Sequence, residues 1–148
     1  AIDVFPKEPG SDAEAFVSPL QRFDNVILTP HIGGSTEEAQ ANIGAEVADK
    51  LVEYSDNGST VGAVGFVQVS LPSKPTRTRF LHIHRNVPGV LRRINDIFAS
   101  RNVNISAQYL QTDSDMGYVV SDIDGEVETD IRSELESIEG TIRVRFLY

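Results

Sequence analysis

The chain has 148 residues, of which 40% are hydrophobic and 24% are charged, values typical of a folded globular protein. Its formal net charge of -9 argues against binding to nucleic acid, whose phosphates need a basic surface. No apolar run approaches the roughly 20 residues that span a bilayer, so no membrane role is expected. With no cysteine and three histidines, neither a disulfide nor a metal site is expected, and the composition fits a cytoplasmic protein.

The first segment of the chain contains two short apolar runs, residues 1–5 and 25–29, which predict buried strands. The chain begins inside the first run and has no initiator methionine or signal peptide. We therefore expect it to be a piece of a longer protein.

A long helix is predicted over residues 35–56, because apolar side chains recur on one helical face. Ser35 and Glu38 stand at the spacing of a capping box at its start. Gly58 supplies the left-handed residue that ends it. The apolar face is formed by Ala39, Ile43, Val47, Ala48, Leu51 and Val52.

Residues 58–77 have the composition of a linker, with glycines at 58, 62 and 65 and prolines at 72 and 75. The segment is too apolar for a free tether, so part of it is expected to dock on a partner surface. The glycines are candidates for a hinge, although a passive spacer would explain them equally well. The apolar residues concerned are Val64, Phe66, Val67 and Val69.

The remaining residues, 78–148, predict the order strand, helix, strand, strand, helix, strand. This pattern indicates a ferredoxin-like βαββαβ sandwich, in which four antiparallel strands carry two helices on one face. Open edges of such a sheet invite pairing with a second copy. The predicted strands are residues 79–85, 103–112, 116–124 and 141–148, with helices starting at Pro88 and around Ile131.

A histidine follows the second predicted strand, in the sequence Thr29-Pro30-His31-Ile32-Gly33-Gly34. His31 is suited to proton transfer near neutral pH, and a carboxylate on its other ring nitrogen would raise its pKa. Glu8 is the candidate for that carboxylate. A lone histidine in a turn is more often a surface or capping residue, so the pattern alone leaves catalysis open.

A second polar group precedes the first helix of residues 78–148. His84 and Asn86 are two residues apart and would face the same way on a strand, next to a helix start that can bind a carboxylate. Asn104, at the next strand, can accept from an ammonium group. The alternative is that Asn86 is only an N-cap and Asn104 only a turn residue.

The segments Ala1–Phe5 with Glu8-Pro9, and Asn25–Thr36, resemble the C-terminal signature of the D-2-hydroxyacid dehydrogenases. The resemblance implies that His31 is the acid/base and that Glu8 pairs with it. It also implies that Asp3, Gly33 and Gly34 lie at the nicotinamide end of NAD. The family's Gly-x-Gly-x-x-Gly loop and its substrate-binding arginine have no counterpart, so the chain alone is expected to be inactive.

Residues 82–91 and 102–105 closely resemble the ACT domain, a regulatory module that binds amino acids between two copies. The resemblance implies that His84, Asn86 and Asn104, with the backbone of Gly89 and Val90, bind L-serine or another small amino acid. It also implies a homodimer through the ACT domains.

Together the resemblances cover nearly the whole chain and are most like the serine-regulated bacterial members of that dehydrogenase family. Such members oxidise 3-phospho-D-glycerate to 3-phosphohydroxypyruvate and form homotetramers. The expected fold class is α+β, with an incomplete Rossmann-type α/β segment and long helix (1–57), a linker or hinge (58–77) and an ACT domain (78–148). Two alternatives remain, a stand-alone amino-acid sensor and a dimerisation module without catalysis.

Overall fold

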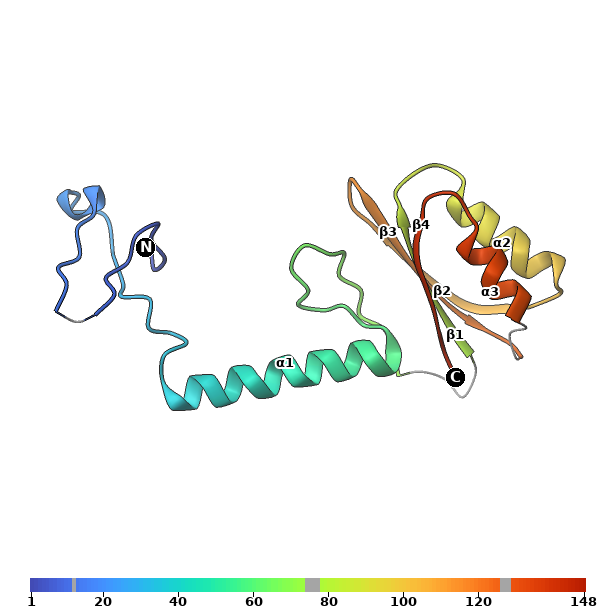
Figure 1. The fold of residues 1–148 in the computed structure, drawn as a ribbon, viewed down its shortest axis with the longest axis horizontal. Helices are drawn as coiled ribbons and strands as arrows, with labels where there is room; N and C mark the ends of the chain where they lie inside the picture. Colours follow the sequence, from blue (N-terminus) through green and yellow to red (C-terminus); the bar gives the residue numbers. More distant parts are fainter. Residues whose placement is uncertain (12, 74–77, 126–128) are drawn as a thin grey trace. The chain divides into compact units, whose positions relative to one another are not determined.

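The computed structural model describes residues 1–11, 13–73, 78–125 and 129–148. It divides into two compact units, Ala1–Val47 and Ala48–Tyr148 (Figure 1). The division falls inside a long helix, and the domain boundaries predicted at residues 57 and 77 stay predictions. Within the described ranges, no helix combines the length and the apolar character needed to cross a membrane.

The Ala1–Val47 unit holds little regular structure. Ile2 and Leu28 form an isolated parallel bridge rather than the two full strands that were predicted. No third strand flanks this pair in the described part of the unit, so most of its backbone groups lack a ladder partner. A short 3-10 helix, η1 (Pro19–Arg22), follows Ser18, whose hydroxyl caps it.

Helix α1 (Glu37–Asn57) begins close to the predicted position but with a different cap. The Thr36 hydroxyl accepts the N–H of Ala39 at 3.1 Å, so Thr36 is the N-cap. The N-cap predicted at Ser35 is therefore wrong by one residue, and the capping box predicted with Glu38 is not formed. Two glutamates in the first turn favour this helix end electrostatically.

The end of α1 follows the prediction. Gly58 has a φ of 84°, and its N–H reaches the carbonyls of Glu53 and Tyr54 at 3.2 and 3.1 Å. The predicted apolar face of α1, in contrast, is not buried, and none of the helix residues belongs to a core. The large side chains of that face are exposed: Ile43, Val47, Leu51 and Val52.

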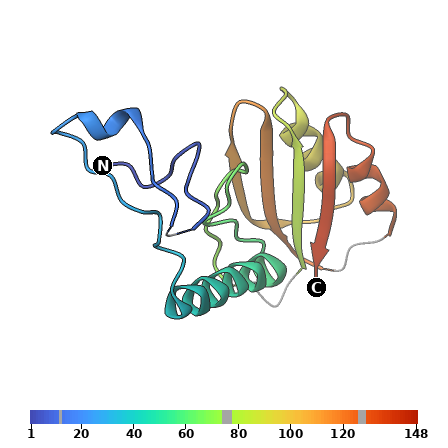
Figure 2. The ribbon, with the colours of Figure 1, turned by 60° about the vertical axis from the view of Figure 1, so that its left-hand side comes forward.

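The Ala48–Tyr148 unit contains a four-stranded antiparallel sheet with the strand order β2-β3-β1-β4, as a ferredoxin-like fold requires. Helices α2 and α3 cover one face of this sheet (Figures 1 and 2). The predicted βαββαβ order is confirmed, with bounds within about two residues for most elements. The elements are β1 (Thr78–Arg85), α2 (Val90–Ser100), β2 (Ile105–Thr112), β3 (Met116–Ile123), α3 (Thr129–Glu136) and β4 (Thr141–Leu147).

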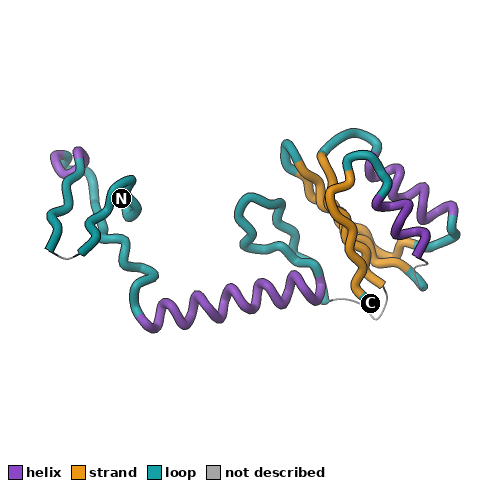
Figure 3. Tube along the Cα trace, viewed as in Figure 1, coloured by secondary structure: helices purple, strands orange, loops and turns teal. Residues whose placement is uncertain are grey.

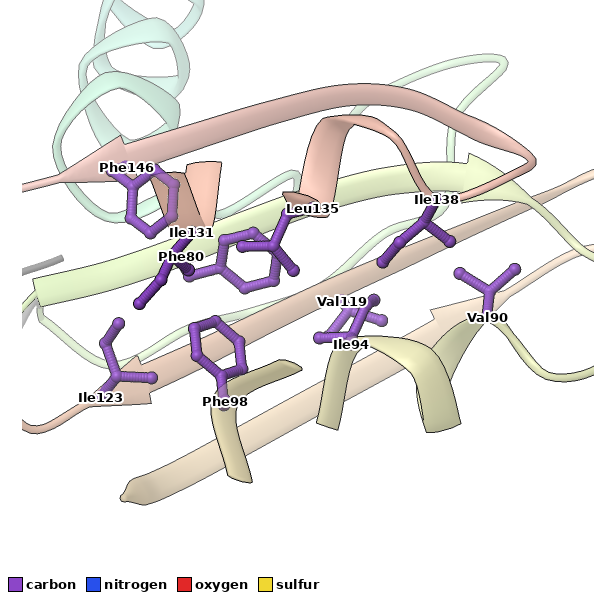
Figure 4. Packing of buried hydrophobic residues seen from close by; sticks show 10 residues of the cluster. All are labelled: Phe80, Val90, Ile94, Phe98, Val119, Ile123, Ile131, Leu135, Ile138 and Phe146. Atoms are coloured by element: carbon purple, nitrogen blue, oxygen red, sulfur yellow. The ribbon is translucent and has the colours of Figure 1, made fainter. Parts of the chain in front are cut away.

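The main core lies between the sheet and the two helices, where ten buried side chains meet (Figure 4). Phe80 of β1 meets the ring of Phe98 from α2 edge-on, with 5.2 Å between ring centroids. Strand alternation places Phe80 and Val119 on this face. Full burial of one such side chain stabilises the fold by about 1.5–3 kcal/mol.

The opposite face of the sheet is covered by residues 58–73, here called the strap, which is loop throughout its length (Figure 3). Val67 and Leu71 of the strap are buried against Leu81 and Tyr118 of the sheet. The Tyr118 hydroxyl donates to the carbonyl of Gly58 at 2.8 Å. Part of the predicted linker therefore docks, but on the sheet of its own chain. Its last residues, 74–77, lie outside the described ranges.

A buried arginine joins the strap to the sheet. Arg79 of β1 is fully buried and binds both carboxylate oxygens of Asp122, at 2.6 and 2.9 Å. Its remaining nitrogen, Nη1, donates to the carbonyls of Asn57 and Pro72, each at 3.0 Å. These two carbonyls stand at the two ends of the strap. One guanidinium thus satisfies its donors with partners from three segments.

Candidate functional site

The structure brings His31 and Glu8 together, as predicted. Nδ1 of His31 lies 2.9 and 3.0 Å from the two carboxylate oxygens of Glu8. Glu8 is itself anchored, because its Oε1 accepts the N–H of Phe5 at 3.0 Å. A carboxylate only accepts hydrogen bonds when ionised, so Nδ1 carries the proton and Nε2 is left for another partner.

The charges of this pair stabilise each other. The hydrogen bond that His31 donates to Glu8, and the negative charge of Glu8, raise the pKa of His31. The Phe5 N–H and the His31 ring in turn lower the pKa of Glu8. Both side chains remain accessible, with exposed fractions of 45% for His31 and 36% for Glu8. The pair can therefore exchange a proton with a bound molecule.

Asp3 lies beside this pair and has a partner that the sequence did not indicate. Its Oδ1 accepts the hydroxyl of Thr29 at 2.5 Å and the backbone N–H of His31 at 3.0 Å. These bonds, led by that of Thr29, lower the pKa of Asp3. The parallel bridge of Ile2 with Leu28 places Asp3 opposite this turn, and a bridge of one residue pair leaves no periodic signal in the sequence.

The turn after His31 is open. An added Cβ at Gly33 would meet no atom within 4 Å, and one at Gly34 would lie 3.7 Å from Ile43. Neither glycine has a positive φ, whereas His31 does, at 52°. A cavity of about 500 Å³ adjoins the turn. Its lining includes Phe5, Glu8, Phe16, Thr29, His31 and Ile32.

In the second predicted site, His84 is buried at the end of β1 with only 3% of its surface exposed. Its Nδ1 donates to the carbonyl of Arg85 at 2.8 Å, which fixes the tautomer and leaves a lone pair on Nε2. That Nε2 is buried and has no hydrogen-bond partner among the described residues. The ring lies over Gly117 of β3, where an added Cβ would be 2.3–3.0 Å from three ring atoms.

Asn86 and Asn104 are both anchored within the chain. Asn86 donates to the carbonyl of Asp113 at 2.6 Å, which ties the β1–α2 loop to the β2–β3 hairpin. It is not an N-cap, because α2 is capped by Gly89 in a left-handed conformation. Asn104 donates to Asp124 at 2.9 Å, at the other end of β3 from the hairpin.

One chain therefore does not bring Asn104 to His84, since the eight-residue length of β3 separates their neighbours. The other predicted contributors, Gly89 and Val90, stand at the start of α2, with Val90 buried in the core. A cavity of about 550 Å³ touches Val90, and its lining includes neither His84 nor Asn86. Among the described residues, no cluster of histidines and carboxylates could hold a metal ion.

Sequence reasoning missed His82. It is fully buried on the same face as His84, with 5.4 Å between the ring centroids. Nε2 bonds the Thr141 hydroxyl at 2.9 Å, while Nδ1 is buried without a partner among the described residues. Burial, and then the neighbouring His84, lower the pKa of His82 to about 4. The alternation of His82 and His84 along a strand was the signal that could have revealed it.

Comparison with known proteins finds a family match in the C-terminal part of the chain. Residues 80–143 match the model of the AHAS small subunit-like ACT domain. A solved ACT domain from the GTP pyrophosphokinase of Chlorobium tepidum is 16% identical, with a TM-score of 0.42 over 47% of this chain and 95% of that one. Together the family match and the four-stranded fold make the C-terminal sheet an ACT domain.

Two relatives match the whole chain. It is 60% identical over 148 residues to a D-3-phosphoglycerate dehydrogenase of Haemophilus influenzae and 60% identical over 150 residues to one of Escherichia coli. Both matches cover 100% of this chain and 36% of the relative. By sequence the chain is similar over its whole length to these D-3-phosphoglycerate dehydrogenases, and it spans about a third of their length.

Proposed function

We propose that this chain provides the acid/base pair and the regulatory domain of an NAD-dependent oxidoreductase. The proposed reaction oxidises 3-phospho-D-glycerate to 3-phosphohydroxypyruvate in L-serine biosynthesis. The observation that carries the proposal is the 2.9 Å contact between Nδ1 of His31 and Glu8, in a chain 60% identical to D-3-phosphoglycerate dehydrogenases.

In the oxidation, Nε2 of His31 takes the proton of the substrate hydroxyl. At the same time a hydride leaves the carbon atom that bears this hydroxyl. The ionised Glu8 holds the other ring nitrogen and stabilises the imidazolium that forms. His31 must be neutral to accept the proton, so oxidation should increase as the pH rises through the pKa of His31. In the reverse direction the protonated form is the active one, and the raised pKa favours it.

The residues present fit one end of NAD, which supplies hydride transfer when bound. Gly33 stands in open space, so a ligand can approach its backbone closely. Oδ1 of Asp3 is bonded to Thr29 and His31 of this chain. Asp3, Gly33 and Gly34 would hold the nicotinamide end. The sequence has no Gly-x-Gly-x-x-Gly loop for the pyrophosphate, so we expect the 148 residues alone to bind NAD weakly and to be inactive.

The catalytic proposal is tested in a chimera, in which this chain replaces the matching part of the Haemophilus influenzae relative. His31→Asn should lower kcat for 3-phospho-D-glycerate oxidation by about 10²–10⁴-fold. Glu8→Gln should lower it by at least about tenfold and move the rise of kcat/KM to lower pH, because the pKa of His31 falls. Glu46→Gln, which neutralises a carboxylate of α1, is the control.

An active chimera whose pH profile is unchanged by Glu8→Gln would contradict the assignment of this pair. Turnover of NAD by the isolated chain would contradict the expectation that it is inactive. Either result is independent of the regulatory half of the proposal.

For the ACT domain we propose binding of a small amino acid, L-serine, between two copies. His84 and Asn86 of one copy, with the backbone of Gly89 and Val90, would meet Asn104 of the other. Two observations support this. The buried Nε2 of His84 has an acceptor lone pair without a partner in the described part of the chain, and one chain alone keeps Asn104 remote from it.

Calorimetry with L-serine on the purified chain tests this site, with L-alanine and glycine as competing ligands. His84→Ala and Asn104→Ala should each abolish the heat of binding, whereas Asn25→Ala should not. Mixing the two defective chains should restore one intact site per dimer, because each chain supplies the residue that the other lacks. Unchanged binding in both variants would show that serine binds elsewhere, and no heat of binding with the unmodified chain would favour a dimerisation module.

A further inference from the structure

The backbone of His31 is held in an unusual conformation. Its φ of 52° lies in the left-handed region, which residues with a Cβ rarely adopt and which costs free energy. In the described ranges, Asn102 is the other non-glycine residue with a positive φ, and it follows the end of α2, where asparagine is common. His31 follows no helix, so its conformation needs another cause.

Three hydrogen bonds surround this conformation, and two of them meet at one atom. Oδ1 of Asp3 accepts the His31 N–H at 3.0 Å and the Thr29 hydroxyl at 2.5 Å. The Thr29 hydroxyl oxygen also lies 3.5 Å from the carbonyl oxygen of Ile2, which is longer than an ordinary O–H···O hydrogen bond. The third bond joins the His31 ring to Glu8 at 2.9 Å.

We propose that Thr29 and Asp3 are positioning residues, which hold the backbone of His31 left-handed and thereby aim its ring at Glu8. The Thr29 hydroxyl fixes the carboxylate of Asp3, and that carboxylate fixes the His31 N–H. Without this bond the N–H loses its charged acceptor, and rotation about φ to an ordinary value carries Cβ and the ring away from Glu8. The proposal rests on the proposed function only for the role of His31 as acid/base.

Asp3 therefore has a role distinct from contact with the cofactor. Its Oδ1 serves the His31 turn, which leaves Oδ2 for the nicotinamide end proposed above. Thr29 has no other proposed role, so removal of its hydroxyl tests positioning without removing a charge.

The experiment uses nuclear magnetic resonance on the 148-residue chain and needs no activity. The φ of His31 is measured by backbone couplings, its ring pKa by pH titration, and its amide exchange by deuterium. Thr29→Val and Asp3→Ala should return φ to negative values, lower the pKa of His31 and speed exchange of its amide about tenfold. Thr29→Ser should restore all three values.

Ser18→Ala is the matched control, since it removes a hydroxyl that caps η1 in the same unit without touching His31. If His31 keeps its φ and pKa in Thr29→Val and Asp3→Ala, the proposal is wrong. It is equally wrong if Ser18→Ala changes the φ, pKa and amide exchange of His31 in the same way. The loss of any hydroxyl in the unit would then have this effect. Both results leave the catalytic assignment to be judged by the chimera.

Discussion

The two units fix an imidazole in opposite ways. In Ala1–Val47, His31 is 45% exposed and is held by hydrogen bonds to Glu8 and Asp3 on loops that have little core. In Ala48–Tyr148, His84 is 3% exposed and is held by packing over Gly117 and by one backbone bond. The accessible imidazole is thus held by polar bonds in place of packing, whereas the buried imidazole is held mainly by the core.

Truncation of the core should give the largest effect. Phe98→Ala removes a fully buried ring that contacts Phe80, and we expect it to lower the free energy of unfolding of the ACT domain by about 3–5 kcal/mol. Urea unfolding monitored by backbone circular dichroism measures this loss. Phe23→Ala, at an exposed position of the first unit, is the control and should cost far less. Equal losses in Phe98→Ala and Phe23→Ala would mean that the two units do not differ in how strongly packing stabilises them.

The buried His82 should make the stability of the ACT domain depend on pH. Its pKa is about 4 in the fold and near 6.5 when unfolded, so the unfolded chain binds the proton more readily between these values. The stability that neutral His82 contributes is complete above pH 6.5 and is lost as the pH falls toward 4, on the order of 3 kcal/mol. The urea midpoint should therefore fall less steeply with decreasing pH in His82→Leu than in the unmodified chain. Identical slopes would exclude His82 as the origin of the pH dependence.

A methyl group at Gly117 should disturb His84. The added Cβ would overlap the ring, which cannot swing freely because Nδ1 is bound to the Arg85 carbonyl. Gly117→Ala should cost about 1–3 kcal/mol in thermal unfolding and abolish the proposed serine binding. Gly44→Ala, whose methyl meets nothing within 4 Å, is the control. Normal serine binding in Gly117→Ala would mean that the ring position is unimportant to the ligand.

The smallest effect concerns the start of α1. Thr36→Ala should cost about 1 kcal/mol of local stability, whereas Ser35→Ala should change it by less than about 0.5 kcal/mol. Hydrogen exchange of the Ala39 amide, which donates to Thr36, reports the difference directly. A larger effect at Ser35 would restore the capping box that the sequence predicted.

Local patterns predicted the helices of the ACT domain well because each of them buries one face. The helical spacing of Ile94 and Phe98, and the alternation of Ile142, Val144 and Phe146 in the last strand, are read directly from the residues. The first unit was harder, since residues 1–5 have the composition of a buried strand while Val4 is 62% exposed. The burial of residues 1–5 depends on contacts with segments distant in the sequence, which the pattern of these five residues does not contain.

The pairing of His31 with Glu8 was predictable only through the resemblance, because 23 residues separate the two side chains. The bonds of Asp3 to Thr29 and His31 depend on a parallel bridge formed by one residue pair, too short to leave a periodic signal. The buried pair of Arg79 and Asp122 was missed for a different reason. A charged residue in a strand is normally assigned to the exposed face, and only the strap covers this one.

The guanidinium of Arg79 also decides where the chain can bend. Because Nη1 binds the carbonyls of Asn57 and Pro72 together, it closes the backbone between them into a loop, and a side chain at Gly58 would clash with Leu81. We expect rotation at Gly62 or Gly65 to change the middle of this loop, while the two ends bound by Arg79 stay in place. While both carbonyls stay bound to Arg79, we expect torsion at these glycines not to be transmitted between the end of α1 and β1.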